Sequence, residues 1–391
     1  MAVRTYLDWN ASAPLLPQAR EAFLAALDLS GNPSSVHGEG RAARSAIEQA
    51  REQVAALAGA EARNVILTSG GTEANALALS PSVQTADDKR PFERLLVSAI
   101  EHPSVLAGGR FDRSRVEQVP VNADGAIDLA ALQRRLEVLA GQRTLVSLMA
   151  ANNETGAVQP VREAAEIAHR HGGLLHVDAV QAAGRIALDI AALGADLLTL
   201  SAHKIGGPKG AGALIKRSED IHFAEALIRG GGQERGSRAG TENVAAIAAF
   251  GAAAAALTST SAADIAHMAR LHDRLEFGLL AATPQAVIFG AGAARLPNTT
   301  LAALPGARAE TLVIAFDLAG VAVSSGAACS SGKVAASHVL AAMGVEPALA
   351  RGAIRVSTGP ATTEAEIDRF LTVWQTLNKS LSNGVKRGLA A

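Results

Sequence analysis

The sequence predicts an α/β protein whose main domain is a mostly parallel β-sheet covered by helices, with a smaller second domain. Two observations lead to this prediction. Short runs of valine, isoleucine and leucine alternate with longer stretches rich in alanine, glutamate and arginine, as in parallel strands connected by helices. After residue 264 this alternation ends: a long helical stretch, 265–280, is followed by strands and helices in a different pattern. We therefore expect a domain boundary near residues 257–261.

The strands expected in the sheet are short apolar segments. They are residues 65–68, 94–98, 144–148, 174–177, 196–200 and 212–215. Helices are expected between or before them, for example over residues 40–57 and 161–171. The longest apolar stretch, 244–257, is mostly alanine and too short to span a bilayer, so it indicates a closely packed helix. Ligands of such a sheet bind outside its strand ends.

The composition is that of an ordinary soluble protein. Of the 391 residues, 49% are hydrophobic and 19% are charged, which allows a large buried core. The formal net charge of -1 offers no basic field for nucleic acid and no polybasic patch for a membrane. The N-terminal residues lack the apolar core of a signal peptide. We expect a soluble, cytoplasmic protein that binds neither nucleic acid nor a membrane.

Two of the expected strands each end at a residue suited to the same cofactor. Asp178 begins the pattern Asp-x-x-Gln after one apolar run, and Lys204 closes Ser-x-His-Lys after the next. A lysine can bond a carbonyl cofactor, and a buried aspartate can pair with the protonated ring nitrogen of pyridoxal phosphate. Alone, the aspartate would be a turn residue and the lysine a solvated charge, the role we assign to Lys209. The order of the two patterns predicts pyridoxal phosphate.

A possible phosphate site lies in residues 68–75, which leave a strand and open a helical run. Glycines such as Gly71 admit a ligand close to the backbone, Thr72 offers a hydroxyl, and the helix start offers free N–H groups. An ordinary capped turn explains this segment equally well. Ser201 and His203, beside the lysine, are natural further phosphate donors. The glycine-rich residues 230–243 are either a linker or a loop that shapes a site or a subunit contact.

The chain has a single cysteine, Cys329, among small and polar residues. One thiol cannot form an internal disulfide or a structural zinc site within a chain, and we predict no metal site. A lone cysteine is usually a small buried hydrophobe. Here the glycine, serine and alanine neighbours indicate a mobile, exposed loop, in which a thiol risks oxidation. A nucleophile is therefore favoured over a bystander.

Further motifs extend along almost the whole chain. They are Tyr-Leu-Asp-x-Asn-Ala at 6–11, Gly-Asn-Pro-Ser-Ser-x-His at 31–37, Glu-His at 101–102, Asn-Asn-Glu-Thr-Gly at 152–156, Arg-Ala-Gly-Thr-Glu-Asn at 238–243 and Ile-Arg-Val-Ser at 354–357. With these, the chain resembles the cysteine desulfurases of the class V aminotransferase branch. The cysteine loop is similar to that of the NifS/IscS-like group rather than the SufS group. The departures are Trp9, the pair at 12–13 and a short tail after Leu377.

The resemblance implies a fold-type I pyridoxal-phosphate enzyme and a homodimer. The large domain would be residues 15–258, with a mostly parallel seven-stranded sheet covered by helices. Residues 1–14 and 259–391 would form a smaller α+β domain that carries the cysteine loop.

The resemblance also implies roles for the cofactor-binding residues. Lys204 would hold the cofactor and move protons, while Asp178 would pair with the ring nitrogen and Gln181 with the ring hydroxyl. His102 would lie over the ring and take part in proton transfer. The phosphate would be bound by Gly71, Thr72, Ser201 and His203, together with Thr241 from the partner subunit. Asn153 and Arg355 would hold the carboxylate of L-cysteine. The Cys329 thiolate would then attack the substrate sulfur, release alanine and keep a persulfide.

Other functions remain open at this point. A selenocysteine lyase or an aminotransferase of the same branch would use the same cofactor, and the cysteine loop argues only against the aminotransferase. A non-catalytic sulfur scaffold would be expected to lose Lys204, Cys329 or Arg355, and all three are present. The sequence does not identify the protein that accepts the sulfur, such as an iron–sulfur scaffold.

Overall fold

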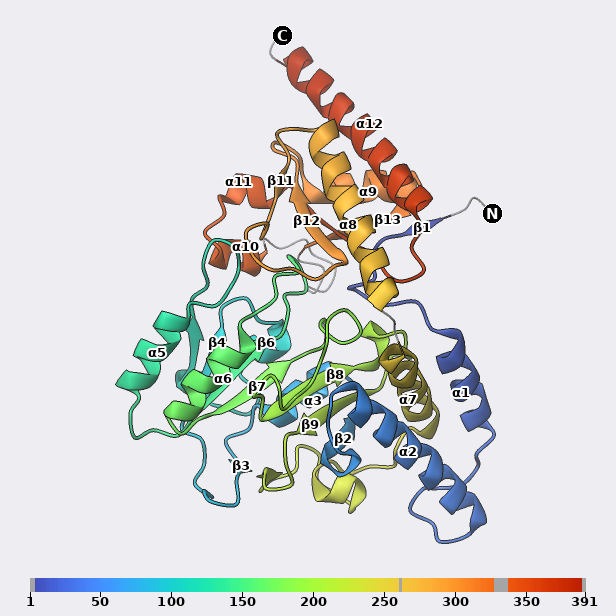
Figure 1. The fold of residues 1–391 in the computed structure, drawn as a ribbon, viewed down its shortest axis with the longest axis vertical. Helices are drawn as coiled ribbons and strands as arrows, with labels where there is room; N and C mark the ends of the chain where they lie inside the picture. Colours follow the sequence, from blue (N-terminus) through green and yellow to red (C-terminus); the bar gives the residue numbers. More distant parts are fainter. Residues whose placement is uncertain (1–3, 260–261, 327–336, 389–391) are drawn as a thin grey trace.

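The computed structural model describes residues 4–259, 262–326 and 337–388 of the chain. The described chain contains two main sheets, drawn one above the other in Figure 1. Cys329, the predicted nucleophile, lies outside the described residues.

The larger sheet has seven strands in the order β2-β9-β8-β7-β6-β4-β5. Their bounds are β2 Val65–Thr68, β4 Arg94–Ser98, β5 Val116–Val119, β6 Thr144–Met149, β7 Leu174–Asp178, β8 Leu197–Ser201 and β9 Gly212–Lys216. β9 is antiparallel to β2 and β8, and the other pairings are parallel. The predicted fold class is confirmed, and each predicted strand matches an observed one to within a residue at either end. The strand β5 was not predicted, because this edge strand is half polar and mostly not buried.

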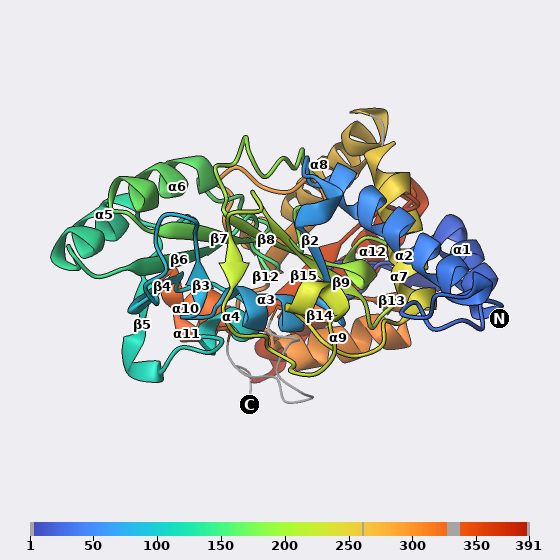
Figure 2. The same cartoon turned by 90° about the horizontal axis from the view of Figure 1, so that it is seen from below.

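Helices cover both faces of this sheet, as Figure 2 shows for α5 and α6 on one side and α3 and α4 on the other. The helices of this part are α1 Pro17–Leu27, α2 Gly38–Leu57, α3 Gly71–Ala78, α4 Pro103–Leu106, α5 Leu129–Val138, α6 Val161–Arg170 and α7 Val244–Thr258. Alternate residues of one strand enter different cores: Leu96 faces the cluster with α2, α5, α6 and α7, whereas Leu95 and Val97 face the cluster with α3. The predicted helices over 40–57, 161–171 and 244–257 are confirmed.

The smaller sheet is antiparallel, with the order β11-β12-β15-β14. Its strands are β11 Val287–Ile288, β12 Thr299–Ala303, β14 Ser324–Ser325 and β15 Ala353–Ser357, and its helices are α8 Ala262–Ala282, α9 Ala309–Leu318, α10 His338–Ala342, α11 Pro347–Ala350 and α12 Glu364–Gly388. A buried aromatic column of Phe316, Phe370 and Trp374 packs α9 against α12. The predicted helix over 265–280 is confirmed as part of α8.

The N-terminus joins this second part of the chain. Strand β1, Thr5–Tyr6, pairs in parallel with β13, Val321–Ala322. This pairing agrees with placing residues 1–14 in the small domain, and the division at 258 itself stays a prediction. The remaining short elements are β3 Val83–Gln84, β10 His222–Phe223 and the 3-10 helices η1 Ala62–Asn64, η2 Arg113–Arg115, η3 Ala202–Lys204 and η4 Gln233–Gly236. Within the described residues, no single helix is long and apolar enough to cross a membrane.

Candidate active site

A cavity of about 560 Å³ lies at the carboxyl ends of the central strands, with lining residues from both main parts of the chain. The predicted site residues that line it are Gly71, Thr72, His102, Asn153, Asp178, Gln181, Ser201, His203, Lys204 and Arg355. Lys209 also lines this cavity although it is exposed, so our interpretation of it as only a solvated charge was incomplete. Thr241 does not line the cavity, and its side chain is exposed.

Strand pairing brings the two decisive residues together. Asp178 is the last residue of β7, and Ser201 is the last residue of its parallel neighbour β8. The 3-10 helix η3 follows at once and places Lys204 beside the same strand ends. The carboxyl edge of a parallel sheet is the usual binding edge of such folds, because adjacent strands all present their ends there.

The Asp178 carboxylate is buried and held by two donors. Its Oδ2 accepts a 2.8 Å hydrogen bond from Asn75 Nδ2, and its Oδ1 accepts one of 3.0 Å from the Val180 backbone N–H. The two donors, one on each oxygen, fix the orientation of the carboxylate. Asn75 was not predicted; a usable signal was its position three residues after Thr72, which places both on one face of α3.

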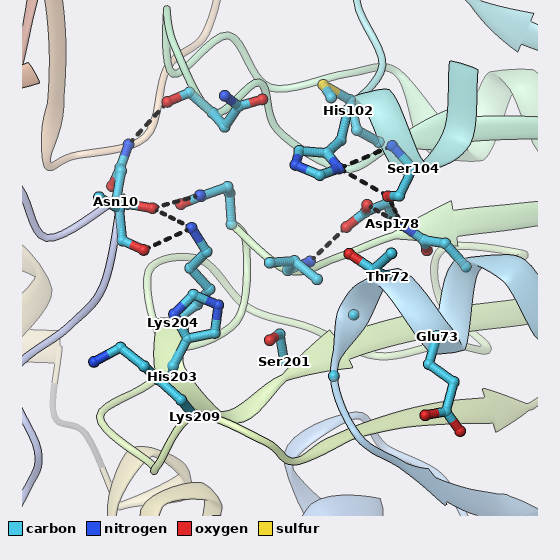
Figure 3. Close-up of a pocket in the computed structure, with 18 of the residues that line it drawn as sticks. Asn10, Thr72, Glu73, His102, Ser104, Asp178, Ser201, His203, Lys204 and Lys209 are labelled. Carbon is cyan, nitrogen blue, oxygen red and sulfur yellow. Dashed lines mark hydrogen bonds between the residues drawn. The ribbon is translucent and has the colours of Figure 1, made fainter. Parts of the chain in front are cut away.

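The Lys204 amine is held by backbone carbonyls of the N-terminal segment (Figure 3). Its Nζ donates to the carbonyl oxygens of Asn10 at 2.5 Å and Ala11 at 3.0 Å. Gln181 Nε2 donates to the same Asn10 oxygen at 3.1 Å. The segment around Asn10 therefore closes one side of the cavity, a role that the sequence motif alone did not reveal.

Gln181 is fixed in one orientation by Arg185. The Arg185 Nη1 donates to Gln181 Oε1 at 2.8 Å and to the Gln181 backbone oxygen at 2.6 Å. Burial lowers the pKa of this guanidinium to about 10, and Arg355 adds to the shift. Arg185 still carries its proton at neutral pH, so it can only donate and holds Gln181 Oε1 as the acceptor. The Gln181 amide nitrogen keeps two N–H groups, one of which donates to the Asn10 oxygen.

The opposite end of the cavity is suited to an anion. Helix α3 starts at Gly71, and no described side chain caps its first turn, so its free N–H groups have no capping acceptor there. Thr72 lies in this first turn, and Ser201 and His203 line the same cavity (Figure 3). Burial lowers the pKa of His203 to about 4, with Lys204 and Lys209 adding to the shift, so the ring is neutral at pH 7.

Arg355 provides a second anion-binding group. Its side chain is buried, Nη1 donates to the Asn153 backbone oxygen at 2.8 Å, and Nη2 donates to Asp8 Oδ1 at 2.8 Å. Its Nε has no hydrogen-bond partner among the described residues. A buried guanidinium N–H without an acceptor is costly and is a natural donor for a ligand carboxylate.

The glycine-rich residues 230–243 are anchored rather than a free linker. Glu234 is buried, and its carboxylate accepts two hydrogen bonds from Arg51, at 2.7 and 2.9 Å. Glu234 and Arg235 adopt positive φ angles of 46° and 54°, which non-glycine residues adopt only at a cost. Arg238 Nε donates to Glu73 on α3 at 2.8 Å. These contacts fix the loop that presents Thr241 at the surface.

Comparison with known proteins identifies the family of the chain. The sequence matches the family described as aminotransferase class-V over residues 5–370. The chain belongs to the aminotransferase class-V family. It is 47% identical over 376 residues to a cysteine desulfurase of Cereibacter sphaeroides, covering 95% of this chain and 94% of that protein. It is 41% identical to a cysteine desulfurase of Sinorhizobium fredii, covering 96% and 97% of the two chains.

Solved structures of related proteins share the fold of this chain. A NifS-like protein from Rickettsia africae superposes with a TM-score of 0.85 at 36% identity, covering 96% of this chain and all of the other. The protein SspA, solved in complex with cysteine, has a TM-score of 0.74 at 28% identity, with 92% of this chain covered.

Among the described residues, no group of three or more histidine, aspartate or glutamate side chains is placed to hold a metal ion.

A buried acid lies beneath the two segments that border residues 327–336. Ser337 Oγ donates to Glu154 Oε2 at 2.6 Å, and a Cβ on Gly326 would come within 2.8 Å of the same oxygen. Burial raises the pKa of Glu154 to about 7, against opposing contributions from Ser337 and Arg355. The folded protein thus holds this proton more tightly than the unfolded chain, whose ordinary value is 4.5.

We expect Glu154→Gln to gain stability relative to the unmodified protein as the pH rises. The stabilisation from the Glu154 proton is complete below pH 4.5 and is lost as the pH rises to about 7. Between pH 5 and pH 8 the difference in unfolding free energy should shift toward the variant by up to about 3 kcal/mol. Urea titrations at both pH values measure it, with exposed Glu163→Gln as the control that should show no shift. An equal difference at both pH values would contradict the assignment.

Proposed function

We propose that the protein is a pyridoxal-phosphate-dependent cysteine desulfurase that converts L-cysteine to L-alanine and holds the sulfur as a persulfide on Cys329. One observation carries the proposal: Lys204 and Asp178 share a cavity with an uncapped helix start at one side and a buried arginine at another. The similarity to cysteine desulfurases over nearly the whole chain supports it.

The residues that line the cavity fit the cofactor in each of its functional groups. Asp178, a hydrogen-bonded carboxylate, suits a protonated ring nitrogen, and the amide nitrogen of Gln181 suits an ionised ring hydroxyl. The first turn of α3 with Thr72, Ser201 and the neutral His203 suits a phosphate. Lys204 Nζ supplies the amine that a carbonyl group requires. When bound, pyridoxal phosphate supplies an electron sink for cleavage of bonds at the substrate.

Arg355 and Asn153 would hold the substrate carboxylate. The Nε of Arg355, which has no partner among the described residues, is a donor available for it, while its Nη atoms donate to Asn153 and Asp8. The Asp8 carboxylate fixes the plane of the guanidinium, so that a second carboxylate meets it in one orientation. This arrangement favours an amino acid with a free carboxylate, such as L-cysteine.

The remaining steps depend on one amine and one thiol. Lys204 Nζ would carry a proton to or from the substrate carbon, because it lines the cavity at the same strand edge as Asp178. The Cys329 thiolate would form a bond to the substrate sulfur while the carbon–sulfur bond breaks and its electron pair stays with the carbon. That carbon would take up a proton to give alanine, and a persulfide would remain on Cys329. We propose that this sulfur then passes to an acceptor protein such as an iron–sulfur scaffold.

Replacement of Cys329 by serine should separate this chemistry from other reactions of the family. The variant should bind pyridoxal phosphate with an unchanged absorption spectrum but release alanine from L-cysteine at least about 100-fold more slowly, because a hydroxyl is a much weaker nucleophile than a thiolate. It should also carry no labelled sulfur after incubation with ³⁵S-cysteine, whereas Ser330→Ala should behave as the unmodified protein.

Two outcomes would contradict the persulfide mechanism. Alanine formation by Cys329→Ser at the unmodified rate would exclude the thiol as nucleophile. If the unmodified protein acted on L-selenocysteine but not on L-cysteine, and Cys329→Ser left that activity unchanged, a selenocysteine lyase would be favoured. Transfer of label from the loaded protein to candidate acceptor proteins identifies the sulfur acceptor.

We also propose a homodimer in which Thr241 completes the phosphate site of the partner subunit. The support is the contrast between a firmly anchored loop and an exposed threonine that does not line its own cavity. A loop held by one buried and one partly buried ion pair keeps its shape at the surface, as a contribution to a neighbouring site requires.

Mixed dimers test this proposal. Lys204→Ala lacks the essential amine, and Thr241→Glu places a negative charge beside the partner's phosphate, so each variant alone should be inactive. In a mixed dimer, the Thr241→Glu subunit keeps its own lysine and meets an intact Thr241 from its partner, so a random mixture should recover about a quarter of the unmodified activity. Mass spectrometry confirms that mixed dimers form. No recovery in their presence, or full activity of a monomer, would contradict the shared site.

A further inference from the structure

His102 and Asp178 are joined by two residues that no part of the proposed function uses. Asn75 Nδ2 donates to Asp178 Oδ2 at 2.8 Å and to Ser104 Oγ at 2.9 Å. The Ser104 Oγ lies 2.7 Å from His102 Nδ1, and the Ser104 backbone N–H donates to the same nitrogen at 3.1 Å. Figure 3 shows this connected row of side chains along one wall of the cavity.

The donors and acceptors in this row leave only one arrangement of the protons. Asp178 is a carboxylate and accepts, so the amide of Asn75 must turn its nitrogen toward it. The same nitrogen donates to Ser104 Oγ, and the serine hydrogen is then directed to His102 Nδ1. Since the Ser104 backbone N–H also points at Nδ1, that nitrogen carries a lone pair. The proton of a neutral His102 therefore lies on Nε2.

We infer that Asn75 is a positioning residue that orients the Asp178 carboxylate and, through Ser104, keeps the proton of a neutral His102 on Nε2. The inference rests on the proposed function for its catalytic meaning. A neutral imidazole with this tautomer offers a hydrogen-bond donor at Nε2 and no base there. Proton abstraction from the substrate is then left to Lys204.

The surroundings of His102 agree with a neutral ring. Burial lowers the pKa of His102, the nearby Asp178 opposes this shift, and Lys204 and His338 add to it. His102 is also the N-cap of α4, where the capping atom must accept from the helix backbone. An imidazolium would direct an N–H from Nδ1 at the Ser104 N–H, so the cap opposes protonation.

The buried side chain of Asn75 carries an energetic cost that its contacts at the cavity explain. It is almost completely buried, and its Oδ1 has no partner among the described residues. A buried amide oxygen without a donor is unfavourable, and a smaller residue would avoid it. The amide nevertheless donates two hydrogen bonds, and both go to residues that line the cavity.

The experiment is nitrogen NMR on the full-length protein labelled with ¹⁵N-histidine, with His102 assigned by its missing signal in His102→Gln. We expect the Nε2–H tautomer of a neutral ring at pH 7, with and without pyridoxal phosphate. In Asn75→Ala and in Ser104→Ala, the Nδ1–H form should become detectable. Ser104→Thr keeps the hydroxyl and should give the same spectrum as the unmodified protein. Asn64→Ala removes a buried asparagine that does not line the cavity, and it should leave His102 unchanged.

The cofactor gives a second measurement. Because Asn75→Ala removes a hydrogen bond to the Asp178 carboxylate, its affinity for pyridoxal phosphate should fall about tenfold, followed by the absorption of the lysine-bound cofactor. An imidazolium or an Nδ1–H tautomer in the unmodified protein would overturn the inference. So would an unchanged tautomer in Asn75→Ala and Ser104→Ala, because the α4 cap alone would then fix it. Failure of the unmodified protein to bind the cofactor would instead overturn the proposed function, and the tautomer in the cofactor-free protein remains an independent result.

Discussion

The parallel pairing of β7 with β8 is the constraint on which the site depends. Residues of both strands are buried on both faces, so a shift of register would turn apolar side chains out of two separate cores. That fixed register places Asp178 opposite Thr199 and leaves Ser201 at the neighbouring strand end. The immediate turn into η3 then places Lys204 at the same edge. Packing of the strands thus brings the acid and the amine to the same edge.

Asn10 connects this edge to the rest of the molecule. Its carbonyl accepts from Lys204 and Gln181, while its backbone N–H donates to Ser357 Oγ at 3.0 Å and its Nδ2 donates to Thr299 Oγ1 at 2.9 Å. Ser357 and Thr299 belong to the smaller sheet. One fully buried residue, Asn10, therefore connects the lysine to the sheet that also carries Arg355. A change in how the two sheets meet would alter both ends of the cavity.

The sequence predicted most of the sheet because its central strands are continuous apolar runs, and β5 escaped because an edge strand needs no such run. Asp178 and Lys204 could be predicted because each lies at or just after the end of an apolar strand. The contacts of Asn75 and Asn10 could not, since both depend on segments far apart in the sequence meeting in space. The exposure of Thr241 likewise follows from the anchoring of its loop by Glu234, which no local pattern indicates.

Chemical trapping of the cofactor tests the central claim most directly. The protein is loaded with pyridoxal phosphate, reduced with borohydride, digested and analysed by mass spectrometry for lysine peptides that carry the reduced cofactor. Among the described residues two lysines line the cavity, Lys204 and Lys209, so the measurement must choose between close alternatives. The account predicts one labelled residue per chain, Lys204, and no label on Lys209. Label on Lys209 in place of Lys204, or no stable label, would contradict it.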